Sequence, residues 1–250
     1  MSTPEEVELE AKKAELEALS DSLAEKELDL EELKNSVFKF QHRYYSELGK
    51  KYVELDELRA QIAELKAKKK PQDHKLNQEA EKARTQAKKA AEEYENIDLT
   101  PQEDAKGNAD LDEAKKLYRK IASTIHPDKA TDDKSRKIRT NLMAELNEAY
   151  KKKNIAKMQE ILNKWNESPE AVAGDNTAAE LIRTILAIAR IKRRIVEIGK
   201  EIIELMACDL FLLMNKVHDA DARGRNLLAE TAARINIEIQ AAQKELSAFK

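Results

Sequence analysis

The residues best suited to chemistry are His126, Pro127, Asp128 and Lys129, which follow one another directly. His126 can donate or accept a hydrogen bond through its ring nitrogens, whereas an ionised Asp128 only accepts. Pro127 disfavours helical geometry in the residue before it and has no backbone N–H group, so it predicts the end of a helix. The tetrad is therefore expected to present His126 and Asp128 on an exposed turn.

The segment before this turn, from Leu111 to Ile125, has the pattern of one amphipathic helix. At about 100° per residue, six apolar side chains share one side of it: Ala114, Leu117, Tyr118, Ile121, Ala122 and Ile125. The opposite side carries four basic side chains: Lys115, Lys116, Arg119 and Lys120. One side is thus predicted to pack on a core and the other to meet an acidic partner.

Two further helices are predicted after the turn. Side-chain oxygens of Thr131, Asp132 and Asp133 could cap the first of them. Its apolar stripe is Ile138, Leu142, Leu146 and Ala149. The second helix, residues 154–165, has five apolar residues at helical spacing: Ile155, Met158, Ile161, Leu162 and Trp165. These segments predict a helical hairpin with a polar tip, closed by a short helix.

Three of these segments resemble the J domain, the module of co-chaperones that stimulate ATP hydrolysis by DnaK-type heat-shock chaperones. Residues 117–122, the tetrad and residues 145–150 look like its second helix, signature loop and third helix, in the right order and at the right spacing. The likeness covers roughly a quarter of the chain. It departs from the family in two places, since Ile125 replaces an aromatic residue and the usual first-helix pattern is missing before Ala109.

The resemblance implies roles for the tetrad and the basic helix. Asp128 would pair with a basic group on the chaperone, while His126 and Pro127 shape the loop. Lys129 belongs to the same set of chaperone-binding residues. Lys115, Lys116, Arg119 and Lys120 would meet an acidic surface of the chaperone. The ATPase chemistry would belong to the chaperone.

The composition is typical of long helices and coiled coils. Charged residues make up 37% of the chain and aromatic residues 4%, with five Gly and five Pro. The single cysteine, Cys208, excludes an internal disulfide, and the N-terminus lacks an apolar signal segment, so we expect a cytoplasmic protein. The histidines stand far apart and no phosphate loop or nucleophile elbow is present. We therefore expect no metal, no cofactor and no enzymatic activity.

A heptad seam runs through the N-terminal arm, residues 4–70. Ser2 or Thr3 is expected to cap its helix, which Pro71 should end or kink. A step of four from Tyr44 to Leu48 shifts the phase of the seam and predicts a stutter. Aromatic residues cluster at the stutter: Phe38, Phe40, Tyr44, Tyr45 and Tyr52. We interpret them as interior side chains, and a surface for a binding partner is the alternative.

The C-terminal arm is apolar on more than one side and is expected to break or bend at Gly224. One seam consists of Leu181, Ile188, Ile191, Ile195, Ile198, Ile202, Leu205 and Leu212. A second face consists of Ile182, Ile185, Leu186, Val196, Ile203, Met206, Leu210 and Leu213. Interspersed charges leave no window of ~18 apolar residues, so a membrane span is excluded and partner helices are expected.

These patterns predict an all-α protein in three domains: arm 1–98, J-like module 99–168 and arm 169–250. The simplest architecture is an antiparallel pair of arms that carries the module at one end. Because the C-terminal arm is apolar on more than one side, we also expect a homo-oligomer in which two copies pair. A parallel dimer of each arm is the alternative.

Three functions are compatible with the sequence. The first is a co-chaperone that binds a DnaK-type ATPase. The second is a structural scaffold or assembly protein whose J-like module no longer contacts a chaperone. The third and weakest is a coiled coil that binds nucleic acid through residues 66–70 and 190–194; its binding would depend steeply on salt. The net charge of −3 makes this third function the least expected.

Overall fold

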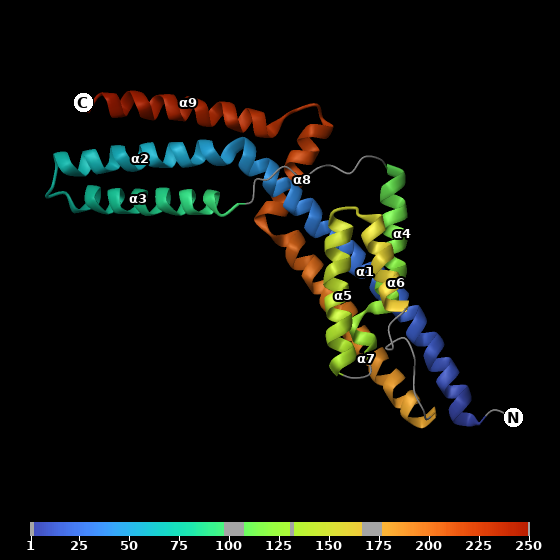
Figure 1. The fold of residues 1–250 in the computed structure, drawn as a ribbon. Helices are drawn as coiled ribbons and strands as arrows, with labels where there is room; N and C mark the ends of the chain where they lie inside the picture. Colours follow the sequence, from blue (N-terminus) through green and yellow to red (C-terminus); the bar gives the residue numbers. More distant parts are fainter. Residues whose placement is uncertain (1–2, 98–107, 131–132, 167–176, 250) are drawn as a thin grey trace. The chain divides into compact units, whose positions relative to one another are not determined.

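The computed structural model describes residues 3–97, 108–130, 133–166 and 177–249, and every regular element in these ranges is helical (Figure 1). The prediction of an all-α chain is confirmed. The chain divides into two compact units: Met1–Asn35 with Glu103–Ala207, and Ser36–Gln102 with Cys208–Lys250. The expected domain boundaries at residues 98/99 and 168/169, and the expected capping residues Thr131 and Asp132, lie outside the described residues.

Helix α1 (Pro4–Tyr44) begins as predicted. The Thr3 hydroxyl accepts a hydrogen bond from the Glu6 N–H at 3.2 Å, and the Glu6 carboxylate accepts one from the Thr3 N–H at 2.9 Å. This reciprocal pair satisfies backbone donors that the start of a helix leaves without partners. In the first unit, α1 packs on α7 (Thr177–Ala207) through four buried residues: Leu23, Leu30, Ile191 and Ile198.

Helices α1 and α7 run in the same direction. The ion pairs that join them rise together in residue number: Lys13 with Glu180, Glu27 with Arg194, and Lys34 with Glu201. The predicted antiparallel pairing of the arms is therefore wrong for these helices. The apolar spacing of a heptad pattern is nearly the same in both chain directions. It therefore predicts which faces of two helices pack together, but not whether the helices are parallel or antiparallel.

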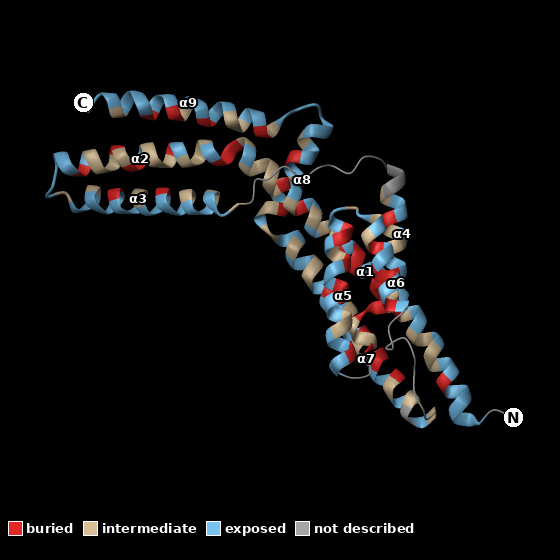
Figure 2. Cartoon of the chain, viewed as in Figure 1, coloured by how far each residue is buried: buried red, intermediate tan, exposed pale blue. Residues whose placement is uncertain are grey.

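Helices α4 (Asn108–Ile125), α5 (Asp133–Lys151) and α6 (Ile155–Asn166) share one core in the first unit (Figure 2). Its central side chains are at most 1% exposed: Tyr118, Ile121, Ile125, Leu146, Met158 and Ile161. The Tyr118 hydroxyl donates to Asn147 Oδ1 at 2.8 Å, so this buried polar group is satisfied. Ala24 and Leu28 of α1 complete the core. The helices predicted before and after the tetrad are confirmed.

In the second unit, the predicted phase shift is a π-helical turn, η1 (Tyr45–Gly49). It connects α1 to α2 (Lys50–Lys69), and α3 (His74–Glu95) then folds back along α2, with Arg84 2.8 Å from Glu57. A Cβ on Gly49 would lie 2.6 Å from Tyr94 Cδ2, so only glycine admits the Tyr94 ring at this distance. Phe40 is buried in the core of this unit and Tyr44 and Tyr52 are partly buried against it, which confirms the interpretation of these three as interior residues. Phe38 and Tyr45 are half-buried.

Helices α8 (Asp209–Ala222) and α9 (Leu227–Ser247) complete the second unit. Gly224 separates them with a φ of 73°, and this break was expected from the sequence. The break before α8 was not expected; there the Cys208 Sγ accepts a hydrogen bond from the Phe211 N–H at 3.4 Å. Helices α2 and α9 also run in the same direction, as two ion pairs show: Arg59 with Glu238 and Lys66 with Glu245.

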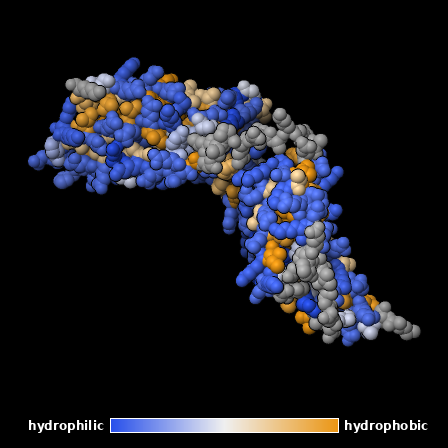
Figure 3. Space-filling model, in the orientation of Figure 1, coloured by the Kyte–Doolittle hydropathy of each residue, from blue (hydrophilic) through white to orange (hydrophobic). Residues whose placement is uncertain are grey.

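The surface is mostly polar. Figure 3 shows hydrophilic side chains over most of the visible face, with apolar side chains in separate patches. None of the described helices has an apolar stretch long enough to cross a lipid bilayer.

Candidate functional site

The tetrad forms a short 3-10 turn, η2 (Pro127–Lys129), where α4 ends. His126 has φ −55° and ψ 133°, the extended geometry that a residue before proline favours. Its Nδ1 accepts a hydrogen bond from the Asp128 N–H at 3.2 Å. A neutral imidazole must then carry its hydrogen on Nε2. The His126 ring therefore both caps the turn and offers one donor to its surroundings.

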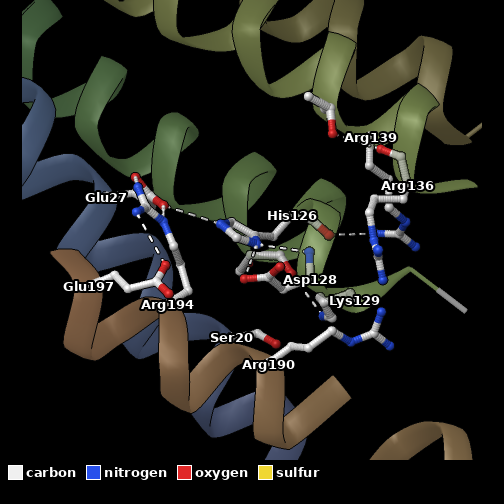
Figure 4. A network of polar contacts seen from close by, with 12 residues as sticks. Ser20, Glu27, His126, Asp128, Lys129, Arg136, Arg139, Arg190, Arg194 and Glu197 are labelled. Carbon is white, nitrogen blue, oxygen red and sulfur yellow. Dashed lines mark hydrogen bonds and ion pairs between the residues drawn. The ribbon is translucent and has the colours of Figure 1, made fainter. Parts of the chain in front are cut away.

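That donor is directed toward α1 and α7 (Figure 4). His126 Nε2 lies 3.3 Å from Glu27 Oε1, and His126 is only 3% exposed, so the expectation of an exposed His126 is wrong. The Glu27 carboxylate also accepts a hydrogen bond of 2.8 Å from Nε of Arg194, whose guanidinium in turn pairs with Glu201. Burial by itself would raise the pKa of Glu27, but the hydrogen bonds from His126 and Arg194 outweigh burial and lower it. An ionised Glu27 thus joins α1 to the turn and to α7.

Two cations hold the backbone around the turn. Lys129 Nζ donates to the Ser123 carbonyl at 2.8 Å, and Arg139 of α5 donates to the Thr124 carbonyl at 2.9 Å. The Arg139 guanidinium also lies 4.3 Å from the centre of the Trp165 ring. The last carbonyls of a helix lack partners within it and favour positive charge, so both contacts stabilise the end of α4. Burial lowers the pKa of Lys129, which is consistent with this internal role.

Asp128 keeps part of its side chain in solvent. The side chain is 24% exposed, and Oδ2 lies 3.7 Å from His126 Nδ1. Arg190 of α7 is close enough to be affected: burial and then the nearby Arg136 lower the pKa of Arg190, while the Asp128 charge raises it. The Asp128 carboxylate thus feels positive charge from α7 and still has acceptor capacity toward solvent.

The four basic residues of α4 have different surroundings. Lys115 Nζ lies 2.9 Å from Glu32 of α1, which also accepts a hydrogen bond of 2.7 Å from the Tyr150 hydroxyl. Burial would raise the pKa of Glu32, but these two hydrogen bonds lower it. Lys116, Arg119 and Lys120 are exposed.

Helix α1 also supplies acidic groups beside this basic surface. Arg119 and Lys120 line a surface cavity of about 400 Å³ together with Asp21, Ser22 and Glu25 of α1. The predicted basic surface therefore already has acidic neighbours within the chain.

The structure brings the tetrad together with residues that the sequence did not indicate: Glu27, Arg139, Arg190 and Arg194. Glu27 carries one usable signal, because it lies four residues after Leu23 and three before Leu30 and so shares a helix side with two buried leucines. The arginines of α7 carry no such signal. In the sequence they help to exclude a membrane span and belong to the segment 190–194 considered for nucleic-acid binding, and neither role places them beside the tetrad.

Other kinds of site have little support. Within the described ranges, no group of three or more His, Cys, Asp or Glu residues is placed to hold a metal ion. Comparison with protein-family models, with curated proteins and with solved structures gives no match for this chain. The tetrad turn and its neighbours are therefore the candidate functional site.

Proposed function

We propose that this chain is a J-domain co-chaperone whose tetrad turn binds a DnaK-type chaperone and stimulates its ATPase. The order of α4, the turn, α5 and α6 agrees with the J-like fold that the resemblance implies. The observation that carries the proposal is the partly exposed Asp128 at the junction of two helices, on a turn that His126 shapes from its buried side.

Each residue of the predicted set has a part in this proposal. The Asp128 carboxylate pairs with a basic group of the chaperone, and the exposed Lys116, Arg119 and Lys120 meet its acidic surface. Pro127 fixes the turn. Lys115 and Lys129 join the contact by exchanging their partners within the chain, Glu32 and the Ser123 carbonyl, for groups on the chaperone.

A structural scaffold is the second candidate, and one observation favours it. His126 is 3% exposed and contacts Glu27, which in turn binds Arg194. The tetrad therefore has a use inside the protein, because it connects α4 to α1 and α7. On this alternative the turn needs no chaperone.

The two candidates are separated by the steady-state ATPase rate of a DnaK-type chaperone from the same source. It is measured with the parent chain, with Asp128→Asn and with Asp133→Asn. The control changes a carboxylate at the start of α5 whose side chain is 94% exposed. We expect stimulation by the parent and by Asp133→Asn, and loss of most stimulation with Asp128→Asn. If none of the three chains stimulates the ATPase, the scaffold is the better account.

A further inference from the structure

One side of α7 carries large apolar side chains that the described residues leave exposed. They are 42% to 68% exposed: Ile182, Ile185, Leu186, Val196, Ile203 and Met206. The other side of the same helix packs on α1 through the buried Ile191 and Ile198. An exposed apolar row of this length on a helix marks a surface that another helix covers.

This row has the register of a coiled coil. Ile182, Ala189, Val196 and Ile203 follow at steps of seven, and so do Ile185, Lys192, Gly199 and Met206, three residues later. Positions of this kind form the seam of a two-stranded coil. We call these eight residues the outer seam. Its one charged member, Lys192, is directed to α1, where its Nζ lies 2.8 Å from Glu15.

We propose that the outer seam binds the outer seam of a second copy of this chain, with the two α7 helices antiparallel. This direction follows from the residues that each register sets against one another. Antiparallel pairing about the middle of the seam sets Ile182 against Met206, Ile185 against Ile203, and Ala189 against Gly199. The fourth pair is Lys192 against Val196, where the Lys192 ammonium is directed away from the seam to Glu15 of its own chain. The helices approach closely at the small residues and interlock at both ends.

Parallel pairing of the same seam is poorer. It would set Lys192 against Lys192, which brings like charges together at the middle of the seam.

The size of the seam bounds the strength of the dimer. From Ile182 to Met206, at about 1.5 Å per residue, the seam is about 36 Å long, and with a helix width of about 10 Å each copy contributes on the order of 400 Å². Stable complexes bury about 800 Å² per partner. We therefore expect a dimer that forms in the micromolar concentration range and dissociates on dilution.

The first test measures molecular mass by sedimentation equilibrium from about 1 to about 200 μM chain, a range that spans micromolar dissociation constants. The parent is compared with Ile203→Glu and with Ile237→Glu. Both isoleucines are 68% exposed, but Ile237 lies on α9 outside the seam. We expect Ile203→Glu to raise the dimer Kd at least about tenfold and Ile237→Glu to leave it unchanged, with the helix content of both variants equal to that of the parent by circular dichroism. A parent that is monomeric throughout, or equal effects of the two substitutions, overturns the proposal.

The second test determines the direction of pairing. In a chain with Cys208→Ser, a single cysteine is placed by Ala189→Cys in one variant and by Gly199→Cys in another; Gly199 has open space around its Cβ position. When the two variants are mixed and oxidised, we expect a disulfide that joins the Ala189→Cys variant to the Gly199→Cys variant. We expect little disulfide between two copies of the same variant. Cross-linking of the Ala189→Cys variant with itself would show a parallel pair and overturn the antiparallel model.

Discussion

Glu27 and His126 are 99 residues apart in sequence, yet Glu27 Oε1 lies 3.3 Å from His126 Nε2. This contact means that the geometry of the tetrad turn depends on a helix outside the hairpin that carries it. Arg194 of α7 binds the same carboxylate, so α1, α7 and the turn are coupled through one side chain. Substitutions at Glu27 of α1 or Arg194 of α7 should therefore alter the geometry of the tetrad turn.

Replacing Glu27 by alanine should destabilise the first unit. The side chain of Glu27 is 8% exposed, and its removal leaves His126 and Arg194 without their shared acceptor. Breaking a buried ion pair costs several kcal/mol, and because Arg194 retains Glu201 we expect a loss of about 2 kcal/mol. Urea denaturation followed by circular dichroism measures it. Glu25→Ala, at an exposed position on the same helix, should change the free energy of unfolding by less than about 0.5 kcal/mol.

The same carboxylate predicts an acid-sensitive fold. The folded state lowers the pKa of Glu27 below its ordinary 4.5, so the unfolded chain takes up this proton at a higher pH than the folded chain does. The contribution of Glu27 is complete above its ordinary pKa and is lost as the pH falls through the folded-state pKa. Urea midpoints between about pH 6 and pH 3 should therefore fall more steeply for the parent than for Glu27→Gln. Parallel curves for the two chains would contradict this assignment.

If the turn binds a chaperone, Arg190 should compete for Asp128. Burial and the nearby Arg136 lower the pKa of Arg190, a residue of α7, whereas the negative charge of Asp128 raises it. Arg190 and Asp128 therefore attract each other within the chain. Arg190→Gln weakens this internal attraction and increases the fraction of molecules with a free Asp128. We expect the concentration for half-maximal ATPase stimulation to fall by about twofold to tenfold. Arg193→Gln, an exposed arginine on α7, is the matched control and should have no such effect.

The effect of Gly49→Ala on the free energy of unfolding should change sign when the Tyr94 ring is removed. A Cβ at position 49 would approach Tyr94 Cδ2 to 2.6 Å, so Gly49→Ala should destabilise the second unit by about 1 to 2 kcal/mol through overpacking. In a Tyr94→Ala background the 2.6 Å contact is gone and the nearest neighbour of the added Cβ is Tyr45 Cδ1 at 3.1 Å. A small shift of this half-buried ring relieves that contact, and alanine then gains up to about 1 kcal/mol over glycine from helix propensity. Thermal or urea unfolding of the four chains measures both effects. Destabilisation of equal size in both backgrounds would show that the ring is not the cause.

The sequence predicted what depends on local pattern. The helix before Pro127, the break at Gly224, the Thr3 cap and the phase shift at Tyr44 each follow from spacing or from the stereochemistry of one residue type, and each is confirmed. The role of the tetrad as a chaperone contact stays a prediction.

What the sequence could not predict depends on contacts between distant segments. The shared direction of α1 and α7 has no signature in a heptad pattern, and the link from Glu27 to His126 requires two helices to be placed first. The sequence around Cys208 has the pattern of one continuous apolar helix. The break between α7 and α8 could not be predicted there, because cysteine is an uncommon residue at the start of a helix.

The shared direction of α1 and α7 also has a consequence for folding during synthesis. Glu27 and Arg194 are separated by 167 residues, so the ribosome must make most of the chain before α7 can cover Leu23 and Leu30. Because translation proceeds at about 5 to 20 residues per second, Leu23 and Leu30 of α1 remain without α7 for on the order of ten seconds or more. Until then α1 is a target for chaperones that hold exposed apolar segments, and truncation anywhere before α7 should leave a nascent chain that aggregates.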